Sequence, residues 1–338
     1  MSRAASFAER WARNNLTRKA TEEELTVLSL FFSTCNGDEM AAARRARRYY
    51  KARGPGGLTE LWHGGHPDDE DILASCQDTY IVPLETRSVG GRRLTLIQLP
   101  ASPGADTHDC GNCVLSAKAL LRRWLMILDV RLREDPTPGE EMVFIDVANL
   151  QLSHVKDHFI GSYWKDFVQC IKSAHPFKFS EVHMINTKRM STLMSFLMLH
   201  IGLYSWGRKK ITLHPIAKDI NKTMDIDYYP VEALPNEYGG KAGAMKYLND
   251  EWTKKILSNS KWLEAEKTRF YNTELKLEQN AQSRHRSVVR LHGTNKESYD
   301  MITRTHSCRS LNRQEDLDEG TYGAYRTLKV QANCDFIV

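Results

Sequence analysis

The chain has 338 residues, of which 41% are hydrophobic, so it can bury the core of one large domain or two smaller ones. Its formal net charge of +5 is modest and its basic residues are clustered, which favours local anion-binding patches and argues against a nucleic-acid partner. Seven scattered cysteines without a disulfide-like framework, and no apolar signal segment in residues 1–30, predict a reducing, cytoplasmic location.

The first part of the chain, residues 1–71, is predicted to be a small helical domain. Residues 1–15 form either a loose arm or a short helix. Thr21 is followed by three glutamates, as in a helix N-cap, and Asp38 can cap a second helix over residues 39–53.

Residues 72–260 alternate between strand and helix patterns, which indicates an α/β domain with a mixed, mostly parallel sheet flanked by helices. Strands are predicted at 80–84, 94–99, 142–147, 182–185 and 211–213, and helices at 116–133, 155–174 and 216–224. Gly90 and Gly91 are placed to turn a hairpin between the first two strands. Residues 261–338 are charged and polar, and we expect a helical or flexible C-terminal extension there.

The stretch from Met190 to Gly207 contains no charged residue and is apolar at almost every angle of a helix. Since a surface helix normally has a polar face, this one is either buried on all sides or in contact with a membrane. It is at the short limit for crossing ~30 Å of hydrocarbon, so we do not expect a true span. Cations follow it directly, which suits docking on an anionic membrane, although a charge run is usually only a solvated face.

Motifs that would support catalysis or metal binding are incomplete. Asp146 stands near Ser153 and His154, but no GxSxG nucleophile elbow and no glycine-rich phosphate loop occur. Cys110 and Cys113 have the spacing of half a zinc site, without a second pair to complete it. We therefore expect no enzyme activity, no cofactor and no metal.

Several segments together resemble the CRAL-TRIO lipid-binding family. They are FIDVANLQLSH (144–154), PFKFSEVHMIN (176–186), the apolar helix and LPNEYGG (234–240), and residues 31–53 look like the helical N-terminal domain of that family. The match covers roughly residues 20–260. It is most similar to the branch that contains the α-tocopherol transfer protein and the cellular retinaldehyde-binding protein, in particular their arthropod relatives.

The resemblance implies a cavity between sheet and helices that holds one hydrophobic molecule, with the apolar helix as its lid. Residues at matching positions would line the cavity: Leu121, Leu125, Leu128, Ile145, Val147, Phe167, Cys170, Ile171, Met194 and Leu197. Residues of the lid would contact the membrane: Met190, Leu193, Phe196, Met198 and Ile201. A basic cleft would bind anions or phosphoinositides through Lys178, Arg208, Lys209 and Lys210. The chain departs from the family at Ser33, Cys35 and Ser180, where the family has arginines.

The function implied is that of a monomeric, non-catalytic carrier. It would move a small hydrophobic lipid, of the tocopherol, retinoid or carotenoid kind, between membranes, with peripheral membrane contact. One alternative is a lipid-responsive sensor or adaptor whose C-terminal extension binds a protein partner. Others are a phosphatidylinositol or phospholipid transfer protein and, from a different class, an α/β hydrolase.

Overall fold

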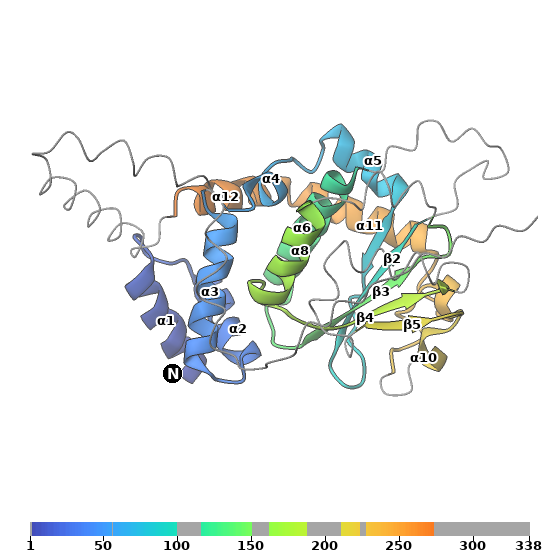
Figure 1. Cartoon of the computed structure of the whole chain (residues 1–338), viewed down its shortest axis with the longest axis horizontal. Helices are drawn as coiled ribbons and strands as arrows, with labels where there is room; N and C mark the ends of the chain where they lie inside the picture. The colour runs from blue at the N-terminus through green and yellow to red at the C-terminus, as the bar shows by residue number, and fades with distance from the viewer. Residues whose placement is uncertain are drawn as a thin grey trace, which may run out of the picture. The chain divides into compact units, whose positions relative to one another are not determined.

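The computed structural model describes residues 2–55, 57–99, 116–150, 162–187, 211–223 and 228–273. All of them belong to one compact unit, Met1–Asn280. The predicted α/β class is confirmed, because a five-stranded, mostly parallel sheet is flanked by helices (Figure 1).

Helices make up the N-terminal part, as predicted: α1 (Arg3–Asn15), α2 (Glu22–Thr34), α3 (Glu39–Arg53) and the short α4 (Thr59–Trp62). Residues 1–15 are a helix and not a loose arm, because Phe7 and Trp11 are buried and the Phe7 ring packs 5.5 Å from that of Phe32. Thr21 and Glu24 form a reciprocal capping box at the start of α2.

The sheet has the strand order β1-β2-β3-β4-β5. Its strands are β1 (Tyr80–Pro83), β2 (Arg93–Gln98), β3 (Glu140–Asp146), β4 (Lys178–Ile185) and β5 (Ile211–His214). The predicted hairpin is confirmed, since β1 and β2 pair antiparallel, and the remaining neighbours pair parallel. Strand β4 begins four residues earlier than the predicted Val182, because Lys178 and Phe179 already pair with β3.

The remaining helices are α5 (Glu70–Asp78), α6 (Ala117–Glu134), α8 (Ser162–Ser173), α10 (Ile220–Thr223), α11 (Met245–Ser258) and α12 (Ser260–Tyr271), with the 3₁₀ turn η5 (Asn236–Tyr238). The helix predicted near residues 216–224 is present but begins later, at Ile220. Asp219 caps it, because its Oδ1 accepts a hydrogen bond from the Lys222 N–H at 3.3 Å.

Helices α6 and α8 lie together beside the sheet, and α11 packs against β1 (Figure 1). The Trp252 indole of α11 donates to the Pro83 carbonyl at 2.9 Å. Helix α12 packs on α3, where the Phe270 ring lies 5.3 Å from that of Tyr50. The first residues of the predicted C-terminal extension are therefore part of the packed core.

Candidate ligand site

Asp146, at the end of β3, joins three parts of the chain. Its Oδ1 accepts hydrogen bonds from the Ala148 N–H at 2.9 Å and from the Asn186 amide at 3.0 Å, and its Oδ2 accepts one from the Tyr238 hydroxyl at 2.8 Å. Three of the motifs that carry the sequence resemblance thus meet at one carboxylate. With both oxygens engaged, Asp146 is structural and is not placed as a free general base.

The LPNEYGG turn reaches Asp146 because of its glycines. Gly239 has a φ of +85°, in the left-handed region, and a Cβ on Gly240 would lie 1.8 Å from the Leu234 carbonyl oxygen. Only a residue without a side chain fits there. This close-packed turn places the Tyr238 hydroxyl at Asp146, the last residue of β3.

The face of the sheet that α6 covers is polar near the start of the strands and apolar near their carboxyl ends. Alternate residues of a strand share a face, so Glu141, Val143 and Ile145 lie on one side of β3. Near the start of the strands Glu141 is fully buried, and its Oε1 accepts from Thr95 at 2.6 Å and pairs with Arg131 at 2.7 Å. Towards the carboxyl ends this face is apolar.

An apolar cavity of about 50 Å³ lies at this carboxyl end. The strands contribute Ile81, Ile97, Ile145 and Met184, and the helices contribute Leu120, Trp124 and Trp164. Residues next to the strands complete the lining: Thr79, Leu99, Val147 and Leu150. Ligand cavities commonly measure about 300–1,000 Å³, so the cavity that the described residues enclose is smaller than a lipid-sized site. The chain leaves Leu99 and Leu150 into segments 100–115 and 151–161, outside the described residues.

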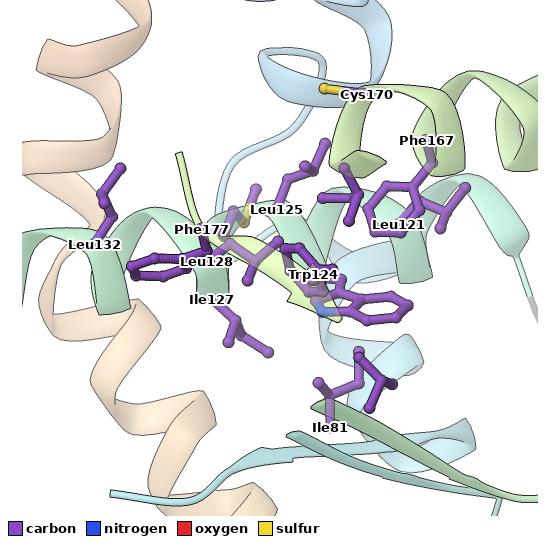
Figure 2. Packing of buried hydrophobic residues seen from close by; sticks show 14 of the residues in the cluster. Ile81, Leu121, Trp124, Leu125, Ile127, Leu128, Leu132, Phe167, Cys170 and Phe177 are labelled. Atoms are coloured by element: carbon purple, nitrogen blue, oxygen red, sulfur yellow. The ribbon is translucent and has the colours of Figure 1, made fainter. Parts of the chain in front are cut away.

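The predicted lining residues divide into two groups. Ile145 and Val147 line the cavity. Leu121, Leu125, Leu128, Phe167, Cys170 and Ile171 are buried but are not among its lining residues. In Figure 2, Trp124 of α6 projects towards Ile81 of β1, and Leu121 lies beside Phe167 of α8. The Trp124 ring also lies 4.8 Å from that of Phe167.

Leu120 and Trp124 were missed because α6 is apolar on several faces. Its buried residues include Leu120, Leu121, Trp124 and Leu125, so periodicity cannot say which face meets the sheet. Leu120 and Trp124 are four residues apart, but so are Leu121 and Leu125, so the spacing alone does not distinguish the two faces.

The predicted lid and most of the predicted anion site lie outside the described residues. They are Met190, Leu193, Met194, Phe196, Leu197, Met198, Ile201, Arg208, Lys209 and Lys210, and the Cys110–Cys113 pair is outside as well. Lys178 is described, and its ammonium lies 2.6 Å from a carboxylate oxygen of Glu140. Among the described helices none is long and apolar enough to cross a bilayer. The same ranges contain no group of three or more His, Cys, Asp and Glu residues placed to hold a metal ion.

The arginines of α3 serve different purposes. Arg45 donates to the backbone carbonyls of His175 and Phe177 at 2.7 and 3.0 Å, so it ties α3 to the chain entering β4. Arg47 donates to Asn15 at 3.0 Å. Arg45 and Arg47 are therefore held by contacts within the protein.

A second cavity, of about 330 Å³, lies between α2, α3, α6 and α12. Its wall contains a buried pair, Arg53 and Asp129, joined by two hydrogen bonds of 2.7 and 2.8 Å, together with Glu24, Glu266 and Arg269. Although this cavity is larger, a lipid tail placed in it would desolvate charged groups without pairing them. The apolar cavity is therefore the candidate for a hydrophobic ligand.

No family model and no curated protein matches the chain. Solved structures do match. One of them, titled "Crystal structure of Sfh5", aligns over 72% of this chain and 83% of its own, with a TM-score of 0.38 and 11% identical residues. A likeness this distant shows nothing about the function of this chain.

Proposed function

We propose that this chain is a non-catalytic carrier of one hydrophobic lipid, of the CRAL-TRIO type that its motifs resemble. The observation that carries the proposal is the apolar cavity between α6, α8 and the carboxyl ends of β2, β3 and β4. In open α/β sheets, ligands bind at the carboxyl ends of the strands.

The position of the cavity fits a site that is completed by further apolar residues. Strand β4 ends at Ile185, and the chain then runs through the apolar stretch 190–207 before it returns as β5. Burying a large apolar side chain is worth about 1.5–3 kcal/mol, so an apolar cover over the cavity would bind a lipid in competition with a bilayer. Opening such a cover exposes the same surface, which favours release at a membrane.

The first test identifies the molecule that is bound to the purified protein. Native mass spectrometry of the full chain, followed by solvent extraction, should give one lipid per protein. Transfer of a fluorescent lipid between donor and acceptor vesicles should be faster with the protein than without it. A protein that carries no lipid and does not accelerate transfer is not a carrier.

Two variants connect this activity to the cavity. Val147→Phe fills the cavity with a benzyl group and should abolish lipid loading, while Val89→Phe makes the same change at an exposed turn residue and should leave it intact. Phe196→Asp tests the proposed lid, and it should slow transfer while circular dichroism stays unchanged. Normal transfer by both Val147→Phe and Phe196→Asp would rule out this site.

The ligand class stays a separate question. The tail of a phospholipid and an isoprenoid both fit an apolar wall. Release triggered by phosphoinositides would also need the cations of the predicted basic cleft, Lys178, Arg208, Lys209 and Lys210. Extraction distinguishes them directly, because a phospholipid contains phosphorus and a tocopherol or retinoid does not.

A further inference from the structure

The cavity between α2, α3, α6 and α12 has the volume of a small-molecule site. It measures about 330 Å³, and ligand pockets begin at about 300 Å³. It shares no lining residue with the apolar cavity at the carboxyl ends of the strands. Its acidic lining residues are Glu22, Glu23, Glu24, Asp129 and Glu266. Only three arginines line it as well, so carboxylates outnumber guanidinium groups in its wall.

Two of these carboxylates are fully engaged by the protein itself. Both oxygens of Asp129 accept hydrogen bonds from Arg53, at 2.7 and 2.8 Å. Both oxygens of Glu24 accept hydrogen bonds from Arg18, at 2.7 and 2.8 Å, and its Oε1 also lies 2.6 Å from Arg269. Neither carboxylate has an oxygen left without a donor, so neither selects a ligand.

The carboxylate of Glu266 is different, because only one of its oxygens has a partner. Glu266 is 8% exposed, and its Oε2 pairs with Arg269 one helical turn further along α12. Its Oε1 has no hydrogen bond or ion pair among the described residues. Burial raises the pKa of Glu266, and the charge of Arg269 offsets this only in part. A buried carboxylate oxygen without a donor is unfavourable, and a cationic donor relieves it.

The arginines in the wall do not offer a ligand a matching cation. The Nε atoms of Arg53 and Arg269 are unpaired, but they have essentially no accessible surface. Both guanidinium groups lie over the Phe270 ring, at 4.0 and 4.8 Å from its centroid. The third arginine, Arg133, is exposed and lies 4.8 Å from the centroid of the Trp262 ring. The free carboxylate oxygen is not shut off from the cavity in this way, so the wall presents an acceptor.

We propose that this cavity binds a small organic ammonium ion, which donates hydrogen bonds to Glu266 Oε1 and packs its apolar part against Val27, Leu132 and Trp262. The Trp262 ring suits such a ligand, since the face of an indole attracts positive charge and Arg133 already lies over it. A neutral ligand leaves the buried carboxylate with the same single partner, and an anion is repelled by it.

The entrance to the cavity favours the same charge. Glu22 and Glu23, in the first turn of α2, line the cavity and are exposed, and their negative potential attracts cations from solution. The ammonium site is separate from the apolar cavity, so this inference goes beyond the proposed carrier function and does not depend on it.

The test compares three ligands that share a phenyl ring and differ in charge: phenethylamine, 2-phenylethanol and phenylacetate. Their binding to the full chain is measured by isothermal titration calorimetry. The amine should bind at least about tenfold more tightly than the alcohol, because a hydrogen bond to a charged group contributes more when the donor is charged too. Phenylacetate should show no measurable binding.

Matched variants connect this preference to the cavity. Glu266→Gln and Glu264→Gln make the same change on α12 at a buried and an exposed residue. Glu266→Gln should bring the amine and the alcohol to equal affinity, and Glu264→Gln should keep the preference. Val27→Trp fills the cavity without removing a charge, so it should abolish amine binding even if Glu266→Gln does not fold. Val89→Trp makes that change at an exposed turn residue and should leave binding intact.

Each other outcome overturns the proposal. Equal binding of the amine and the alcohol to the wild-type protein would show that the cavity does not select charge. Tightest binding of phenylacetate would assign the selection to the arginines. A preference for the amine that survives Glu266→Gln would place the cation at another carboxylate. If none of the three ligands binds, the cavity is not an ammonium site. None of these results bears on the carrier function, because lipid loading is measured separately by mass spectrometry.

Discussion

The Tyr238 hydroxyl donates a hydrogen bond of 2.8 Å to the Asp146 carboxylate, and this contact joins the LPNEYGG turn to the end of β3 across 92 positions of the chain. Burial, followed by the neighbouring Asp146 charge, raises the pKa of Tyr238, so the phenol stays protonated and remains a donor. The contact therefore links the sheet to the segment that follows it, next to the carboxyl ends of the strands.

Replacing Tyr238 by Phe should lower the free energy of unfolding by about 1–3 kcal/mol, since it leaves a carboxylate oxygen of buried Asp146 without its donor. Urea unfolding followed by circular dichroism measures the change. Tyr247→Phe is the control because Tyr247 is 57% exposed, and its stability should stay within about 0.5 kcal/mol of wild type. Equal effects of the two variants would show that the hydrogen bond does not stabilise the fold.

Breaking the buried pair Arg53–Asp129 should destabilise the fold more than Tyr238→Phe does. Asp129→Asn leaves the Arg53 charge buried without its ion-pair partner and should lower the free energy of unfolding by about 3–5 kcal/mol. The comparison is Glu39→Gln, which breaks the half-exposed pair Arg10–Glu39 and should cost at most about 1 kcal/mol. Denaturant midpoints of the two variants give the answer, and a small effect of Asp129→Asn would mean that this network does not hold α3 on α6.

His63 predicts a loss of stability in mild acid. Burial, and then the charge of Arg53, lowers the pKa of His63 to about 4, while its Nε2 lies 2.7 Å from the Arg53 carbonyl oxygen. A histidine pKa below the unfolded value of about 6.5 means that stability is complete above pH 6.5 and falls as the pH drops towards 4.

At pH 4.5, protonation of this histidine should lower the free energy of unfolding by about 2–3 kcal/mol, as calculated from the difference between the two pKa values. His63→Gln retains a donor for the Arg53 carbonyl and has no titration in this range. Urea unfolding at pH 7.5 and pH 4.5 should therefore show a smaller loss for the variant than for wild type. Identical losses would place the acid sensitivity in other groups.

The pair Lys178–Glu140 bears on the predicted anion site. Since Glu140 lies 2.6 Å from Lys178 and offsets its charge, the double variant Lys178→Gln/Glu140→Gln, which keeps the net charge, should change binding to vesicles that contain phosphoinositides less than about twofold. Glu140→Gln alone frees the cation and should strengthen binding, while Glu264→Gln makes the same charge change on α12. Co-sedimentation measures all three, and a large loss with the double variant would establish Lys178 as an anion ligand.

Local patterns were enough to predict much of the fold. Thr21 and Asp38 identified two helix starts, because N-cap preferences depend on the first turn alone, and Gly90–Gly91 identified the hairpin. The helix predicted near residue 216 begins later, at Ile220, where Asp219 caps it, and this cap was also a local signal in the sequence.

The amino-acid sequence is enough to derive the α/β class, the order of the elements and the motifs that resemble a lipid-binding family. Tertiary structure alone decided that Trp124 and not Leu121 lines the apolar cavity, and that Asp146 is bound by Tyr238 and Asn186. Periodicity reports which residues are apolar, whereas the lining of the cavity depends on which face of a nearly all-buried helix meets the sheet.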